Sequence, residues 1–184
     1  MAKAKQLICF DSCVVIDSLR PAADGRRAPI DEILARGKNK EVVIWVSALA
    51  LVETVRIDGV EEANQTAVIE EFFGRPYVEV EAINRQVAKL AREIRSKHEI
   101  SQFDVLHVAT AIIHSCSAWI TVDGIAAKPT KIPKLLEFDR KIIGYPSFRI
   151  ITPSEYARQF IPLFGENLAE YDETVKAKRD AARP

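Results

Sequence analysis

The sequence predicts an α/β fold: a three-layer sandwich whose central, mostly parallel sheet is covered by helices on both faces. Short apolar runs rich in β-branched residues alternate with longer helical patterns along the first 152 residues. Strands that are apolar throughout are typical of parallel sheets buried on both faces. The 184 residues suit one domain (1–152), followed by a charge-mixed C-terminal helical extension (153–184).

The first half of the chain contains two predicted strands and four predicted helices. The run at 7–10 is a strand that stops at Asp11, and residues 14–19 form a short helix before Pro21. A helix at 30–36 ends at Gly37, a suitable C-cap residue. The β-branched run at 42–46 is the second strand, after which Ser47 can cap a helix over 48–57. A further helix covers 61–73.

The second half repeats the alternation with three strands, at 77–80, 119–122 and 148–151. Its clearest helix spans 84–98, because apolar residues recur there at i, i+3, i+4 and i+7 opposite a basic face. An apolar helix follows at 103–115, and the last helix of the extension covers 166–182.

Composition limits the function classes. The 26 basic residues equal the 26 acidic ones, so overall charge does not favour a polyanionic partner, and any nucleic-acid site must be local. Three cysteines, Cys9, Cys13 and Cys116, lie in apolar runs and are expected to be reduced and buried rather than zinc-bound. No run is long enough for a signal-peptide core or a membrane span, so a cytoplasmic location is expected.

Four carboxylates interrupt apolar sequence at positions suited to chemistry. Asp11 and Asp123 each follow a predicted strand, where ligand sites of open α/β sheets gather. Glu53 is the only charge in the apolar segment 48–55, and Asp104 opens the helix at 103–115. Together, such oxygen ligands suit Mg²⁺ or Mn²⁺, which activate water and neutralise charge on a phosphodiester.

Each acid also has a purely structural interpretation. Asp11 can cap the helix after it, and Asp104 completes a Ser-x-x-Asp capping pattern with Ser101. Asp123 and Gly124 form a common turn pair, and Glu53 can face solvent. The joint occurrence of all four acids favours the metal-site interpretation.

The order of these motifs resembles the PIN-domain nucleases, and most closely the VapC-type toxin ribonucleases of toxin–antitoxin pairs. The blocks are Asp11-Ser12, Ser47-Ala48 with Glu53, the stretch 104–111 (DVLHVATA), and 121–123 (TVD). The resemblance covers residues 7–152. It implies a Rossmann-like sandwich and metal-dependent hydrolysis of RNA.

The resemblance also implies roles for single residues and for partners. Asp11, Glu53, Asp104 and Asp123 match the acids that coordinate Mg²⁺ or Mn²⁺, and Ser12 and Thr121 match the hydroxyls beside them. His107 lies one turn after Asp104 and either assists the site, binds RNA or is a structural helix residue. A cognate antitoxin and a homodimer are implied, with helices 14–19 and 30–36 as the candidate dimer surface.

Two basic groups are candidates for contacts with RNA phosphates. One follows Asp123 and contains Lys128, Lys131 and Lys134. The other is the basic face of helix 84–98, with Arg85, Lys89, Arg92 and Arg95, for which a solvated helix surface is the competing interpretation.

Rival functions remain open. A non-catalytic PIN-like module that binds RNA or protein would be favoured by a broken acidic set, and this set is intact. A phosphatase with Asp11 as nucleophile would want an acid two positions later, where Cys13 stands. A receiver domain would want a lysine at the end of a late strand, and none is evident.

Overall fold

The computed structural model describes residues 4–21, 27–122 and 135–160. Their five strands form one sheet in the order β3-β2-β1-β4-β5, and every neighbouring pair is parallel. The strands are β1 (Gln6–Phe10), β2 (Val42–Ser47), β3 (Val78–Glu81), β4 (Ala118–Ile120) and β5 (Arg149–Ile151). The predicted α/β sandwich with a mostly parallel sheet is confirmed.

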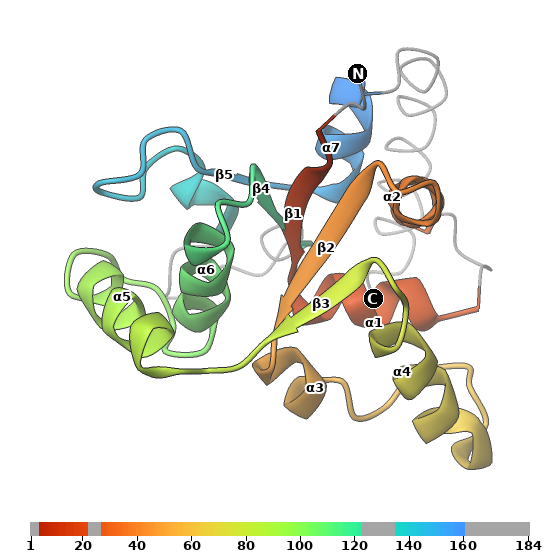
Figure 1. Ribbon diagram of the computed structural model, residues 1–184. Coiled ribbons are helices and arrows are strands. Elements are labelled where there is room, and N and C mark those ends of the chain that lie inside the picture. Colours follow the sequence, from red (N-terminus) through yellow and green to blue (C-terminus); the bar gives the residue numbers. More distant parts are fainter. Residues whose placement is uncertain (1–3, 22–26, 123–134, 161–184) are drawn as a thin grey trace, which may run out of the picture.

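Helices cover both faces of the sheet (Figure 1). One layer contains α1 (Ser12–Leu19), α2 (Ala28–Lys38), α4 (Gln65–Phe73) and α7 (Pro153–Phe160). The other contains α5 (Arg85–Arg95) and α6 (Asp104–Ile113). Shorter helical segments are α3 (Leu49–Glu53), η1 (Glu62–Asn64) and η2 (Leu135–Phe138).

Two apolar cores result, because alternate residues of each strand point to opposite faces. Ile8 and Phe10 of β1 pack under the first helical layer, whereas Cys9 packs with Trp119 under α5 and α6. The apolar side chains of α1 and α2, such as Val14 and Ile33, are buried in the first core. Only the outward faces of these helices would therefore be available for the dimer contact expected from the sequence.

The predicted length of the helix over residues 48–57 is wrong, because α3 ends at Glu53. Residues 54–57 are outside the helix, and Ile57 binds a side chain instead: its N–H donates to Gln65 Oε1, and Gln65 Nε2 donates to the carbonyls of Ile57 and Val60. Gln65 is buried and opens α4, so the segment expected as one helix over 61–73 starts with the short η1 turn.

Helix α7 packs with the sheet domain. Tyr156 is 1% exposed within the first core, and its hydroxyl donates to Gln6 Oε1 in β1 at 2.6 Å. The helix predicted at 166–182 lies outside the described residues. No helix among the described parts of the chain is long and apolar enough to cross a membrane.

Candidate active site

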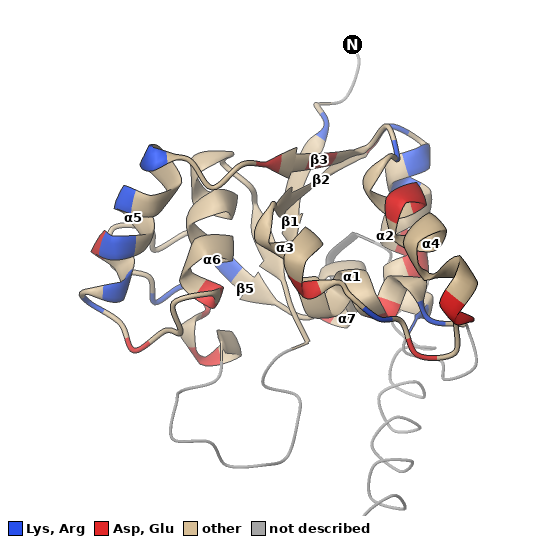
Figure 2. Cartoon of the chain, turned by 90° about the horizontal axis from the view of Figure 1, so that it is seen from below, with Lys and Arg blue, Asp and Glu red and all other residues tan. Residues whose placement is uncertain are grey.

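The candidate site lies at the edge of the sheet where the parallel strands end. Asp11 directly follows the central strand β1, and its N–H donates to the carbonyl of Ile120 in β4 at 3.0 Å. Thr121 directly follows β4. Figure 2 looks onto this edge, where α1, α3 and the start of α6 meet. It is the edge at which open α/β sheets place their ligand sites.

The carboxylate of Asp11 is buried and receives hydrogen bonds from four donors, one of them the Ser12 hydroxyl at 3.5 Å. Its Oδ1 accepts from the Ser12 N–H at 2.8 Å, so Asp11 does cap α1. Its Oδ2 accepts from Thr121 Oγ1 at 2.7 Å and from the Cys13 thiol at 3.0 Å. Donors from two neighbouring segments therefore fix the orientation of this carboxylate.

Cys13 is not among the site residues that the sequence predicts, yet it belongs to the group of side chains bonded to the Asp11 carboxylate. Burial and the adjacent Asp11 carboxylate raise the pKa of the Cys13 thiol well above its ordinary value. The thiol is thus protonated at neutral pH and can donate to Asp11, while Sγ accepts from the Val122 N–H at 3.5 Å. Its position two residues after Asp11, in the first turn of α1, is the sequence signal that could have indicated this contact.

Glu53, the last residue of α3, pairs with His107 of α6. The two side chains meet at 3.0 Å through Glu53 Oε2 and His107 Nε2. His107 is 1% exposed and Glu53 32% exposed, so the pair spans from the core to the surface. The hydrogen bond from His107 lowers the pKa of the Glu53 carboxyl; burial opposes this effect, and a hydrogen bond from Ser12 adds to it.

The ring of His107 packs against the sheet. Its ring stacks on Trp119 of β4 with the ring centroids 6.1 Å apart and the planes 12° from parallel. Its Nδ1 is buried and has no hydrogen-bond partner among the described residues. His107 therefore packs in the core and also contacts one of the candidate acids, Glu53.

Asp104 opens α6 and is half-buried. Its N–H donates to Ser101 Oγ at 3.1 Å, which is half of the expected capping box. One helical turn later comes His107, so α6 carries the acid and the partner of Glu53 on one face.

The donor chemistry suits a hard divalent ion, since carboxylate and hydroxyl oxygens are its preferred ligands. Among the described residues, however, no three acidic, histidine or cysteine side chains gather closely enough to hold one metal ion. Asp123, the fourth acid, and the basic group Lys128, Lys131 and Lys134 lie outside the described residues.

A groove between α5 and α6 carries part of the expected basic surface. It has a volume of about 500 Å³ and is open to solvent; Arg92 and Arg95 line it together with Gln102. Arg85 and Lys89 are exposed on the same helix, and Figure 2 shows basic positions along α5. The groove adjoins the start of α6, where Asp104 lies.

Exposed apolar side chains flank the carboxylates. Leu51, Val52 and Val55 in and after α3 are 44%, 69% and 73% exposed, and Phe103, just before Asp104, is 50% exposed. Such a cluster beside polar groups is typical of a surface that a partner covers.

The chain matches known proteins at the level of family and fold. The family model described as PIN domain matches residues 8–132. No curated protein matches the sequence significantly.

Solved structures extend the similarity to most of the chain. VapBC2 from Rickettsia felis bound to a promoter DNA fragment is 13% identical with a TM-score of 0.54, covering 79% of this chain and 97% of that one. DNA-bound VapBC from Salmonella typhimurium is 15% identical, with a TM-score of 0.54 and coverages of 80% and 98%. VapC20 from Mycobacterium tuberculosis, a sarcin–ricin loop cleaving toxin, is 20% identical, with a TM-score of 0.50 and coverages of 68% and 99%.

Proposed function

Because the chain belongs to the PIN domain family, we propose that it is a metal-dependent endoribonuclease, the toxin of a toxin–antitoxin pair. The observation that carries the proposal is the fixed carboxylate of Asp11 at the end of the central strand, bound by Thr121 from the neighbouring strand. Glu53 and Asp104 come from elements that meet at the same edge of the sheet.

Asp11, Glu53, Asp104 and Asp123 are the residues proposed to hold Mg²⁺ or Mn²⁺. When bound, such an ion makes water a stronger nucleophile at neutral pH and neutralises charge that develops on the phosphodiester. The protein's own contribution is orientation. Thr121 and Ser12 fix the Asp11 carboxylate, and His107 holds Glu53 in its ionised form.

The proposed RNA track is the groove between α5 and α6. Arg92 and Arg95 line this groove, and their guanidinium groups suit bidentate contacts to phosphates. The track leads to the start of α6 and therefore to Asp104. Arg85 and Lys89, on the same helix, would extend the track, and the lysines at 128, 131 and 134 remain proposed phosphate contacts.

The proposed protein partner is an antitoxin that covers the carboxylate edge. A further solved structure that is similar to this chain is a toxin–antitoxin complex from Klebsiella pneumoniae. On this chain, the exposed side chains of Leu51, Val52 and Val55 offer apolar contacts next to Glu53. A partner segment bound there would bury these side chains and exclude RNA. A homodimer, as in the sequence-based expectation, completes the proposed assembly.

The test is cleavage of a mixed RNA pool by the purified protein with Mg²⁺ or with a chelator. Asp11→Asn and Asp104→Asn should each lower Mg²⁺-dependent cleavage roughly 100-fold or more, because the loss of a ligand charge removes several kcal/mol of stabilisation. Asp31→Asn is the matched control: Asp31 is an exposed acid on α2, paired with Arg27, and its variant should cleave like the wild type.

Circular dichroism should show an unchanged fold in all three variants. Full cleavage by Asp11→Asn would contradict the nuclease assignment. RNA binding without cleavage by the wild type would indicate a non-catalytic PIN-like module instead. Expression in bacteria tests the toxin assignment, since the wild type should arrest growth and Asp104→Asn should not.

A further inference from the structure

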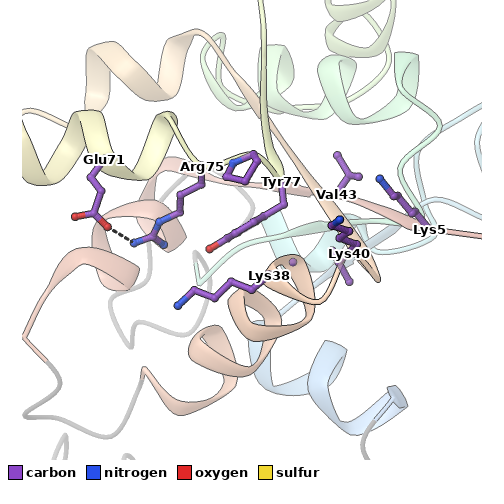
Figure 3. A pocket seen from close by; sticks show the side chains of 10 residues that line it. Lys5, Lys38, Lys40, Val43, Glu71, Arg75 and Tyr77 are labelled. Carbon is purple, nitrogen blue, oxygen red and sulfur yellow. Dashed lines mark hydrogen bonds and ion pairs between the residues drawn. The ribbon is translucent and has the colours of Figure 1, made fainter.

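A second pocket lies at the opposite edge of the sheet, where β1 and β2 begin. Its volume is about 530 Å³, within the range of small-ligand sites. Figure 3 shows basic side chains around it from three parts of the chain: Lys5 before β1, Lys38 and Lys40 at the end of α2, and Arg75 after α4.

The charge of this pocket is one-sided. Among the residues that the structure describes, four cationic side chains line the pocket against a single acid, Glu71, which pairs with Arg75 at 3.4 Å. Residues at the C-terminal ends of α2 and α4 line this pocket, and the partial negative charge of a helix C-terminus favours nearby cations. Two half-charges do not offset three excess positive charges, so the pocket as a whole attracts anions.

Tyr77 supplies a buried polar group without a partner. The residue is 6% exposed and lines the pocket, and its hydroxyl has no hydrogen-bond partner among the described residues. In Figure 3 the hydroxyl points to the same side as the cationic ends of Lys38 and Arg75. Buried hydroxyls are normally hydrogen-bonded, so this one is suited to a ligand.

The position of the Tyr77 ring depends on a glycine. A Cβ on Gly37 would lie 2.4 Å from Cδ2 of Tyr77, which is closer than any real contact. Helix α2 therefore leaves room for the ring at the cost of a glycine in its last turn. The ring of Tyr77 therefore packs directly against the backbone of α2 at Gly37.

Lys40 is in a backbone conformation that normally selects glycine. Its φ is +63°, and the N–H groups of Lys40 and Glu41 donate to the carbonyls of Gly37 and Arg36. This is a Schellman motif with lysine at the C′ position, where glycine is preferred. A solvated helix end explains Lys38 and the Schellman geometry of Lys40, but it does not explain the unpaired Tyr77 hydroxyl.

We propose that this pocket binds the phosphate group of a nucleotide, with Lys38, Lys40 and Arg75 as charge partners and the Tyr77 hydroxyl as a hydrogen-bond donor. The side chains of Val43 and Pro76 form an apolar wall on which the rest of the nucleotide can pack. The nucleotide is a free nucleoside phosphate or a residue of an RNA chain, and the pocket recognises the phosphate common to both. The site is separate from the carboxylates, which lie at the other edge of the sheet.

The first experiment compares ADP with adenosine by isothermal titration calorimetry, in low salt and with EDTA present. The wild type should bind ADP about tenfold or more tightly than adenosine, because only ADP brings the phosphates. The double variant Lys38→Gln/Lys40→Gln should lose about tenfold or more of the ADP affinity. Lys141→Gln, at an exposed lysine outside the pocket, is the matched control and should bind ADP like the wild type.

Tyr77→Phe isolates the hydroxyl. The variant should weaken ADP binding about threefold to tenfold, and its melting temperature should be at least that of the wild type, since no protein contact is lost. The proposal is wrong if the wild type binds ADP no more tightly than adenosine. It is also wrong if the double-lysine variant binds ADP as tightly as the wild type.

The second experiment identifies the source of the phosphate with a fluorescent single-stranded RNA, again in EDTA so that cleavage does not occur. Weaker RNA binding by the double-lysine variant, with a smaller salt dependence, supports an RNA phosphate. Unchanged RNA binding together with lost ADP binding supports a free nucleoside phosphate. Neither readout depends on metal or cleavage, so failure here and failure of the nuclease proposal are distinguishable.

Discussion

At the scale of single residues, Asp11 performs two tasks with one carboxylate. Oδ1 caps helix α1 through the Ser12 N–H, and Oδ2 is bound by Thr121 and Cys13. Capping of helix α1 alone would require only Oδ1 of Asp11. The hydroxyl of Thr121, supplied from a neighbouring strand, is the part of this arrangement that a helix cap does not explain.

Thr121→Val tests the role of that hydroxyl with little change of shape. The variant should lower Mg²⁺-dependent RNA cleavage about 10–100-fold, the usual effect of removing a hydrogen bond to a metal-binding carboxylate. Thr110→Val is the matched control. Thr110 is also buried, but its hydroxyl has no partner among the described residues, so this variant should cleave like the wild type. Equal activity of both variants would show that Thr121 does not position Asp11.

The sequence predicts that Asp11 follows a strand and that Asp104 opens a helix, because strand ends and helix starts are local features. It cannot predict the bond between His107 and Glu53, whose residues are 54 positions apart and meet only when α3 and α6 pack. Cys13 was interpreted as a small buried hydrophobe, which holds for Cys9 and Cys116. The contact of Cys13 with Asp11 depends on the turn between β1 and α1, which composition does not show.

At the scale of elements, helix ends depend on tertiary contacts more than helix interiors do. The strongly amphipathic α5 was predicted almost to its observed bounds, and Asn84 caps it through the N–H groups of Gln86 and Val87. Helix α3 was predicted too long because Gln65, from a later segment, binds the backbone of residues 57 and 60. A local sequence pattern contains no information on a later side chain that binds this backbone.

The end of α2 gives a stability prediction. Lys40→Gly should raise the free energy of unfolding by about 1 kcal/mol, since glycine relieves the positive φ at this position. Lys38→Gly, within the last helical turn, is the matched control and should lower it by about 0.5–1 kcal/mol. Urea denaturation without phosphate measures both. A Lys40→Gly variant no more stable than the wild type would contradict the proposed strain.

At the scale of the whole molecule, the sequence predicts the sandwich well because its short apolar strands and alternating helices are unambiguous. It divides the chain at residue 152, yet α7 follows this point and contributes Tyr156 and Ala157 to the buried core. Its pattern alone, eight residues of mixed charge, does not distinguish a packed helix from an appendage.

Two variants at Tyr156 measure how far α7 belongs to the folded unit. Tyr156→Ala should lower the free energy of unfolding by about 3–5 kcal/mol, the usual cost of removing a buried aromatic side chain. Tyr156→Phe should lower the free energy of unfolding by only about 1 kcal/mol, because it removes only the hydrogen bond to Gln6. Thermal and urea unfolding check both values. Wild-type stability of Tyr156→Ala would support an independent C-terminal extension from residue 153.

Strand β1 runs from one edge of the sheet to the other, so its length sets the distance between the basic pocket and the carboxylates. Its five residues, Gln6–Phe10, separate Lys5 at the basic pocket from Asp11 at the carboxylate edge. The six steps from Lys5 to Asp11, at a rise of about 3.3 Å per residue, give a separation of roughly 20 Å. A single nucleotide held in the pocket would therefore not be a substrate. An RNA in contact with both edges would have to span at least this distance, so the length of β1 sets a lower limit on the length of a chain bound at both ends.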